Sequence, residues 1–415
     1  MLIGLCTLSI PYIRHRWYSL FYRLHIPLYI AYLGTCFWHA KDLRDSWVYL
    51  WATLAIYLAS VLGRAFGKWQ SIHWRRTPWL QGWPATVTVG DGERDFTMGG
   101  LTRLVIRPPR DFTWRPGQHV WLRIPHISWL QQHPFTIASL PSNSLNTAES
   151  SAHEMVFLVR SHSGLTCELL ELAAAAPQAP IAANEEKQDI EVGAPLSVHV
   201  DGPYGGLVED VSALYDTLVF VAGGSGISAC LPHMLDTSRH ISSGTSRVQK
   251  IHLLWMIRHP SQIIWCANEL RTIVATAGAD KIVIDVHITD TSAALSSGDG
   301  TPSKETASIE ELNAMEKDMG LNVETSASMK DIVKMHHGRP FLPDVLPPLL
   351  SGRRIMFFGK LVQWRGIALV SFVSRAGCGP KHLRADLANA ASRAQRRVFS
   401  GHSEVVNLHT EAFGW

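Results

Sequence analysis

The sequence predicts a multidomain chain: N-terminal transmembrane helices, then an antiparallel β-barrel, then a doubly wound α/β domain. Three observations predict this fold class. Apolar runs long enough to cross a bilayer are confined to residues 1–66. Short strands separated by turn residues follow over residues 83–210, as is typical of a barrel. In residues 211–415, buried strands alternate with helical stretches, which favours a parallel sheet.

The composition narrows the functional classes. A length of 415 residues suits two or three domains, and a hydrophobic content of 46% with a mean hydropathy of +0.04 is high for a soluble enzyme. The net charge is +3 and no basic block occurs, so we expect no nucleic acid partner. The six cysteines form no CxxC pair, which argues against a disulfide framework and a zinc site.

Two segments are the predicted membrane spans, Leu24–Ala40 and Ser46–Gly63. The first 13 residues are apolar but too short to span, and we interpret them as the end of a helix. Lys and Arg cluster at 14–23 and at 64–76, so the positive-inside rule places the chain from residue 64 onward in the cytosol. We therefore expect an integral membrane protein in contact with lipid, with residues 67–82 as an interfacial connector.

Two histidines lie within the first predicted span. His25 and His39 are fourteen positions apart, which is roughly 21 Å along a helix and about 40° from the same face. Ionisable side chains inside a membrane are functional by default, and this spacing suits one axial ligand to each of two haem irons, one per leaflet. The alternative is that His25 lies at the interface beside Arg23 and that His39 reaches the opposite interface.

The stretch Trp114–Ser139 organises the middle of the chain. A Pro-Gly turn feeds a strand, and the sequence His-Pro-Phe-Thr-Ile-Ala-Ser follows at 133–139. A flavin needs a hydroxyl or amide near N5, an apolar wall and a rigid strand; Thr136, Pro134 and Phe135 are candidates to supply them. The alternative is an ordinary barrel strand.

Two further turns lie in the predicted barrel. A Gly/Ser/Thr turn with Gly164 and Thr166 opens a helix, which suits either a phosphate group or a plain helix cap. Gly202 begins Gly-Pro-Tyr-Gly-Gly, a predicted turn that ends the barrel. Residues 174–192 are predicted to be a surface insertion.

A glycine-rich turn follows the first buried strand of the C-terminal domain. Strand 218–222 leads into Gly223-Gly224-Ser225-Gly226-Ile227 and a helix, the context that a dinucleotide site requires. Arg258 follows strand 251–257, so it is placed either to meet a ribose 2′-phosphate or to be a solvated surface arginine. Residues 291–330 are predicted to be a disordered insertion.

The ordered motifs resemble those of the ferric/cupric reductase transmembrane family, which shares ferredoxin-reductase-type FAD and NAD(P) domains with the NADPH oxidases. They are HPFTIAS at 133–139, GPYG at 202–205, GGSG at 223–226, Gly-Arg-Pro at 338–340, Cys-Gly-Pro at 378–380 and the terminal EAFGW. The resemblance extends from about residue 11 to residue 415. In that family an upstream helix carries a second histidine pair, so the chain resembles an N-terminally truncated member, or one whose haem ligation a partner chain completes.

The resemblance implies a role for each matching position. It implies FAD contacts by His133, Pro134, Phe135, Thr136, Ser139, Gly164, Thr166 and Gly202. It implies NADPH contacts by Gly223, Gly224, Gly226, Ile227, Arg258, Arg339, Cys378, Gly379 and Pro380. Two of these positions have reactive roles in the family: Thr136 near flavin N5 and Cys378 beside the nicotinamide. The resemblance also implies a terminal aromatic over the flavin ring, for which Phe413 is the first candidate and Trp415 the second. A buried C-terminal strand is the alternative for the terminus, and the segment before Cys378 is longer than in the family, through an insertion or a gene-model error.

The resemblance also implies a function. The implied protein is a ferric-chelate reductase of the plasma membrane. It passes electrons from NADPH in the cytosol through FAD and haem b to ferric or cupric chelates on the other side. The alternatives are a superoxide-generating NADPH oxidase, a haem-free membrane-tethered NADPH:flavin reductase, and a remnant without activity.

Overall fold

The computed structural model describes residues 1–16, 18–40, 46–73, 82–89, 100–129, 131–141, 153–162, 164–176, 193–289, 332–350, 352–361 and 380–411. The chain divides into two compact units, residues 1–76 and residues 77–414, and each is described separately. The predicted insertion at 291–330 and four predicted site residues lie outside the described residues: Cys378, Gly379, Phe413 and Trp415.

The first unit is helical. Its helices are α1 (Leu2–Ser9), α2 (Pro11–Arg16), α3 (Tyr18–Ala40) and α4 (Ser46–His73). Among the described residues, one helix is long and apolar enough to cross a membrane: α4 over Ser46–Gly63, with a mean hydropathy of 1.5. Helix α3 has 23 residues, but Arg23 and two histidines interrupt its apolar sequence, so its membrane crossing stays a prediction. Helix α4 continues to His73, into the segment predicted as a connector.

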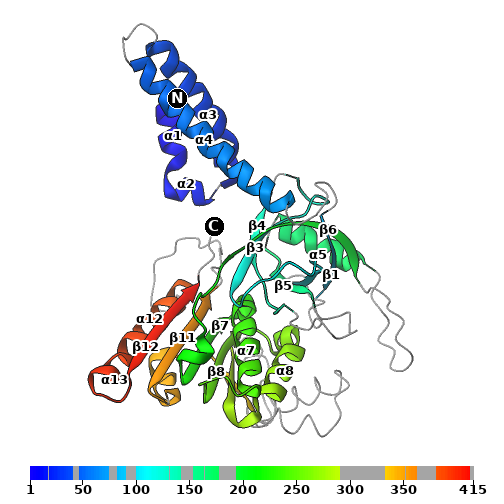
Figure 1. Ribbon diagram of the computed structural model, residues 1–415, viewed down its shortest axis with the longest axis vertical. Helices are drawn as coiled ribbons and strands as arrows, with labels where there is room; N and C mark the ends of the chain where they lie inside the picture. The colour runs from blue at the N-terminus through cyan, green and yellow to red at the C-terminus, as the bar shows by residue number, and fades with distance from the viewer. Residues whose placement is uncertain are drawn as a thin grey trace, which may run out of the picture. The chain divides into compact units, whose positions relative to one another are not determined.

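The second unit begins with an antiparallel sheet (Figure 1). Its strands are β1 (Trp83–Val89), β2 (Leu101–Ile106), β3 (Gln118–Arg123), β4 (His133–Thr136), β5 (Met155–Arg160) and β6 (Ala194–Gly205). Among the described residues their order is β4-β3-β6-β1-β2-β5. The Ala138 N–H donates to the Val156 carbonyl (2.8 Å), which links the two ends of this order into a barrel. Apolar side chains from all six strands and from α5 (Leu165–Ala175) form its core.

The Gly-Pro-Tyr-Gly segment differs from its prediction. Residues 202–205 are the last part of strand β6 rather than a turn, and they pair with β3. The Gln118 side chain donates to the Gly205 carbonyl (3.1 Å), and the strand pair is irregular between His119 and Trp121. The glycines supply the positive φ angles of this irregular strand, 144° at Gly202 and 68° at Gly205.

The rest of the second unit is a parallel sheet with helices on both faces (Figure 1). The strands are β7 (Thr217–Gly223), β8 (Lys250–Ile257), β9 (Ile282–Ile288), β10 (Val333–His337), β11 (Arg354–Leu361) and β12 (Val405–Glu411). The helices are α6 (Val211–Leu214), η2 (Gly224–Gly226), α7 (Ile227–Ser242), η3 (Pro260–Cys266), α8 (Ala267–Ala277), η4 (Ala279–Lys281), α11 (Leu342–Val345), η6 (Pro347–Leu349), α12 (Pro380–Ala394) and α13 (Arg396–Phe399).

The strand order, β10-β9-β8-β7-β11-β12, puts β7 in the centre. All the pairs are parallel, so every strand has its carboxyl end at one edge of the sheet. Helices α7 and α8 pack on one face, and α11 and α12 on the other. A central parallel strand covered on both sides must be apolar throughout, and six of the seven residues of β7 are buried. Strand β12 lies at the sheet edge, and Val406 is its buried residue among those described. It ends at Glu411, so the alternative of a buried strand at the terminal EAFGW stays a prediction.

Candidate functional site

Three barrel strands place a row of side chains next to one another. Thr136 of β4 lies opposite His119 of β3, and His119 lies opposite Tyr204 of β6. The rings of His119 and Tyr204 are 6.2 Å apart, and the Tyr204 hydroxyl donates to Asp201 (2.6 Å). Tyr204 is 44% exposed, so this row presents an aromatic ring to solvent beside the Thr136 strand.

The four residues at 133–136 divide between the two faces of β4, because side chains alternate along a strand. Phe135 pairs with fully buried Val120 and packs against the barrel core. Pro134 and Thr136 therefore share the opposite face. His133 lies on the same side as Phe135, and burial lowers the pKa of its imidazole. Of the predicted flavin contacts in this strand, the structure thus groups Pro134 and Thr136 with His119.

Ser139 has a structural task. Its hydroxyl donates to the Glu154 carbonyl (2.7 Å) and accepts from the Val156 N–H (3.1 Å), and its carbonyl accepts from the Trp114 indole (2.8 Å). These bonds hold the end of the flavin-motif strand against β5. Its predicted contact with the cofactor stays a prediction.

The predicted turn at Gly164 opens helix α5, as expected, and its contact with a phosphate group stays a prediction. Gly164 is the N-cap residue with φ 60°, and a Cβ added there would meet nothing within 4 Å. The His162 N–H donates to the Thr166 hydroxyl (3.0 Å), which closes the turn. The first N–H groups of an eleven-residue helix therefore follow an unobstructed glycine, an arrangement that fits an anionic group.

The glycine-rich turn joins the central strand of the parallel sheet to a long helix. Gly223 ends β7, Gly224 and Gly226 lie in η2, and Ile227 begins the sixteen-residue helix α7. Gly224 has φ +53°, a conformation that residues with a Cβ rarely adopt. The turn and the N-terminus of α7 together fit a pyrophosphate group.

Both predicted phosphate-binding arginines lie at the same sheet edge as this turn. Arg258 directly follows β8, and its N–H donates to the Gln262 side chain (3.0 Å). Arg339 follows β10 and Gly338, whose N–H donates to the Ile288 carbonyl (2.8 Å). Strand β9 separates β8 from β10, so the two strand ends are roughly 10 Å apart. Pro380 is the first residue of α12.

Arg160 is a site residue that the sequence reasoning missed. It ends strand β5 of the barrel and is only 9% exposed. A Cβ atom added at Gly224 would lie 3.6 Å from the Arg160 Nη1 atom, so the guanidinium lies close to the glycine-rich turn. Burial, and then the Arg160 charge, lower the pKa of His162. A buried guanidinium therefore lies between the start of α5 and the glycine-rich turn. The available signal was an arginine that ends an otherwise apolar strand.

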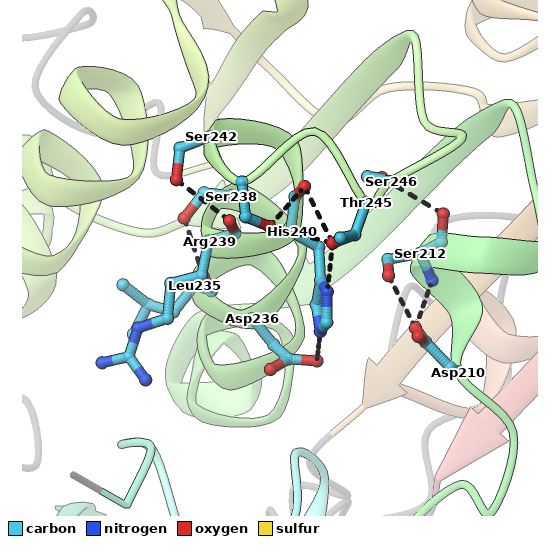
Figure 2. A network of polar contacts seen from close by, with 11 residues as sticks. Asp210, Ser212, Leu235, Asp236, Ser238, Arg239, His240, Ser242, Thr245 and Ser246 are labelled. Carbon is cyan, nitrogen blue, oxygen red and sulfur yellow. Dashed lines mark hydrogen bonds and ion pairs between the residues drawn. The ribbon is translucent and has the colours of Figure 1, made fainter. Parts of the chain in front are cut away.

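The far end of α7 is anchored by a polar network (Figure 2). The His240 Nδ1 atom shares a hydrogen bond with the Thr245 hydroxyl (2.9 Å), and its Nε2 atom lies 3.9 Å from the Asp236 carboxylate. The Ser246 hydroxyl donates to the Ser212 carbonyl (3.1 Å), which ties the following loop to α6. These bonds fix the helix whose other end lies at the glycine-rich turn.

The two predicted haem ligands lie on one continuous helix, α3, as the sequence predicts. The rings of His25 and Phe21 lie 4.8 Å apart and are tilted by 38°, and the His25 Nδ1 atom is buried without a hydrogen-bond partner among the described residues. In the described part of the chain no group of three or more His, Cys, Asp or Glu side chains is placed to hold a metal ion. The role of His25 and His39 as haem ligands stays a prediction.

The comparisons with known proteins agree with this arrangement. Residues 98–207 match the FAD-binding domain family, and residues 215–392 match the ferric reductase NAD-binding domain family. The first match covers most of the barrel, and the second covers the glycine-rich turn and both arginines. The described barrel and parallel sheet thus coincide with matches to an FAD-binding domain family and to the ferric reductase NAD-binding domain family.

The chain is also similar to named reductases and to an NADPH oxidase. The chain is 33% identical over 273 residues to "Probable cell surface ferric reductase kap2" of Aspergillus oryzae, which covers 65% of this chain and 33% of the relative. It is 26% identical over 265 residues to "Ferric/cupric reductase transmembrane component 7" of Saccharomyces cerevisiae, covering 64% and 36%. It is 25% identical over 194 residues to a superoxide-generating NADPH oxidase heavy chain of Dictyostelium discoideum, covering 45% and 26%. The chain spans about a third of the length of the first two relatives.

Proposed function

We propose that the chain is part of a membrane ferric-chelate reductase that uses NADPH, FAD and haem to reduce ferric or cupric chelates on the extracytoplasmic side. One observation carries the proposal: the residues that match the ferric reductase NAD-binding domain bring Gly224, Arg258 and Arg339 to a single sheet edge. The names of the fungal relatives supply the metal substrate.

The described residues divide the binding task. The N–H groups at Gly224–Ile227 bind the pyrophosphate of NADPH, and Arg258 and Arg339 bind its 2′-phosphate. The start of α5 and Arg160 bind the FAD pyrophosphate, while Pro134 and Thr136 form a wall beside the flavin ring. FAD, when bound, supplies the conversion between hydride and single-electron transfer, which no side chain provides.

The membrane part of the proposal rests on the first unit. Helix α4 crosses the plasma membrane and α3 crosses beside it, with the FAD and NAD(P) domains in the cytosol. His25 and His39 would each give one ligand to a haem b iron, and a partner chain would give the others. A haem b held by these histidines would supply single-electron transfer across the membrane.

A second candidate function is superoxide production. The relative from Dictyostelium discoideum carries that activity in its name, although it matches less of the chain. Purified protein with NADPH and ferric citrate distinguishes the two. Iron reduction that superoxide dismutase does not inhibit supports the reductase, and iron reduction that disappears with the dismutase supports the oxidase.

An absorption spectrum of the detergent-purified chain, before and after anaerobic addition of NADPH, tests the proposal directly. We expect a flavin band that loses intensity and a Soret band that shifts. Loss of the flavin band without any Soret band would leave an NADPH:flavin reductase and contradict the haem route. A flavin band that NADPH leaves unchanged would contradict the proposed activity altogether.

The two arginines give a prediction about coenzyme choice. We expect Arg258→Ala and Arg339→Ala each to raise the KM for NADPH about 10-fold, because each removes a charge-assisted hydrogen bond to the 2′-phosphate. The KM for NADH, which lacks that phosphate, should change less than about 2-fold. Arg353→Ala is the matched control, since this side chain is 70% exposed at the opposite edge of the same sheet. Equal changes for the two coenzymes would contradict the assignment.

A further inference from the structure

The glycine-rich turn has a buried hydrogen-bond partner in the neighbouring strand. Trp255 of β8 is 0% exposed, and its register partner in β7 is Ala222, two residues before Gly224. Its indole Nε1–H donates to the Gly224 carbonyl at 2.9 Å. The same carbonyl accepts the Ile227 N–H, so both of its acceptor positions are used.

This bond determines where the next N–H group points. A peptide unit is planar and trans, so the Ser225 N–H lies antiparallel to the Gly224 carbonyl. The carbonyl points at the indole in the covered interior of the sheet. The Ser225 N–H therefore points away from Trp255, at the end of the turn where α7 begins.

We infer that Trp255 is a positioning residue for the dinucleotide site: its indole N–H holds the Gly224–Ser225 peptide in the orientation that presents the Ser225 N–H to the NADPH pyrophosphate. The inference rests on the proposed NADPH site and adds a residue to it. Trp255 itself is fully buried, so it acts through the turn and not by contact with the coenzyme.

The chain offers a matched control. Trp265 of η3 is also buried, at 4% exposed, and among the described residues its Nε1 has no hydrogen-bond partner. Replacing either tryptophan with phenylalanine removes similar volume from the same domain. Only Trp255→Phe removes a bond to the turn.

The experiment measures dissociation constants by calorimetry on the full chain in detergent, with NADP⁺ and with 2′-AMP as probes. For Trp255→Phe we expect the Kd for NADP⁺ to rise about 10-fold and the Kd for 2′-AMP to stay within about 2-fold, because 2′-AMP has no pyrophosphate. For Trp265→Phe we expect both constants to stay within about 2-fold. In turnover, Trp255→Phe should raise the KM for NADPH with little change in kcat, since the turn binds the pyrophosphate equally before and during hydride transfer.

The outcomes separate the inference from the proposed function. If the wild-type chain binds NADP⁺ and Trp255→Phe binds it equally well, the inference is wrong while the proposed function stands. If Trp255→Phe weakens NADP⁺ and 2′-AMP alike, or Trp265→Phe has the same effect, the residue contributes to stability only and the inference is again wrong. If the wild-type chain binds neither probe, the proposed function and the inference both fail.

Discussion

Replacing Asp216 with alanine is expected to lower the free energy of unfolding of the NAD(P)-binding domain by about 3 kcal/mol. The Asp216 side chain is 7% exposed and accepts hydrogen bonds from the Arg247 side chain (2.5 Å) and from the N–H groups of Arg353 and Arg354 (2.9 and 3.0 Å). It joins the start of β7 to the start of β11. Without it, two partly buried N–H groups lose their acceptor. Urea denaturation of the purified chain, followed by circular dichroism, measures the change.

Glu404→Ala is the control for this prediction. Glu404 forms ion pairs with the side chains of Arg353 and Arg354, at 3.0 Å each, but it lies at the surface. Exposed ion pairs contribute little to stability, so we expect little change. Equal decreases in the free energy of unfolding for the two variants would show that the hydrogen bonds between Asp216 and the backbone add no stability beyond that of a surface ion pair.

The same carboxylate gives a pH dependence. Burial alone would raise the pKa of Asp216, but the hydrogen bonds from Arg247, Arg353 and Arg354 outweigh it and hold that pKa below its ordinary value. A carboxyl group with a lower pKa in the folded state stabilises the fold above its unfolded pKa, and this contribution is lost as the pH falls through the folded pKa. The stability difference between the wild type and Asp216→Asn should therefore be constant from about pH 5 to 8 and shrink below about pH 4. A difference that grows on acidification would contradict this reasoning.

The parallel sheet was predictable from the sequence because its signals are local. Strands β7 and β8 are mostly apolar, and the predicted strands, 218–222 and 251–257, begin and end within one residue of the observed ones. Once parallel pairing is assumed, the carboxyl ends share one edge. The meeting of the Gly223–Ile227 turn with Arg258 and Arg339 then follows from topology.

What the sequence did not predict depends on contacts between distant residues. Arg160 lies beside Gly224, 64 positions further along the chain, and no local pattern records that proximity. The Gly-Pro-Tyr-Gly segment has the composition of a turn, yet pairing with β3 makes it a strand. The hydrogen bond between Trp255 and the Gly224 carbonyl is likewise a product of strand register.

Replacing Gly224 with valine has the largest expected effect on coenzyme binding: a rise of about 100-fold or more in the Kd for NADP⁺, measured by calorimetry. Gly224 adopts φ +53°, which is strained for any residue with a Cβ and most of all for a β-branched one. Relief of that strain requires the Gly224 peptide to rotate, which takes its carbonyl away from Trp255 and the Ser225 N–H away from the pyrophosphate. The added methyl groups also approach the Arg160 guanidinium, since the Cβ alone would lie 3.6 Å from its Nη1 atom.

Gly244→Val separates this effect from a general loss of stability. Gly244 has φ +71° in the loop between α7 and β8, and a Cβ there would meet nothing within 4 Å. Both variants therefore have comparable backbone strain, of about 1–2 kcal/mol. Because Gly244 lies before β8, at the sheet edge opposite the glycine-rich turn, its valine variant should unfold somewhat more easily and still bind NADP⁺ with the wild-type Kd. If both variants lost NADP⁺ binding to the same extent, the loss would reflect domain stability, and the turn would have no demonstrated part in holding the coenzyme.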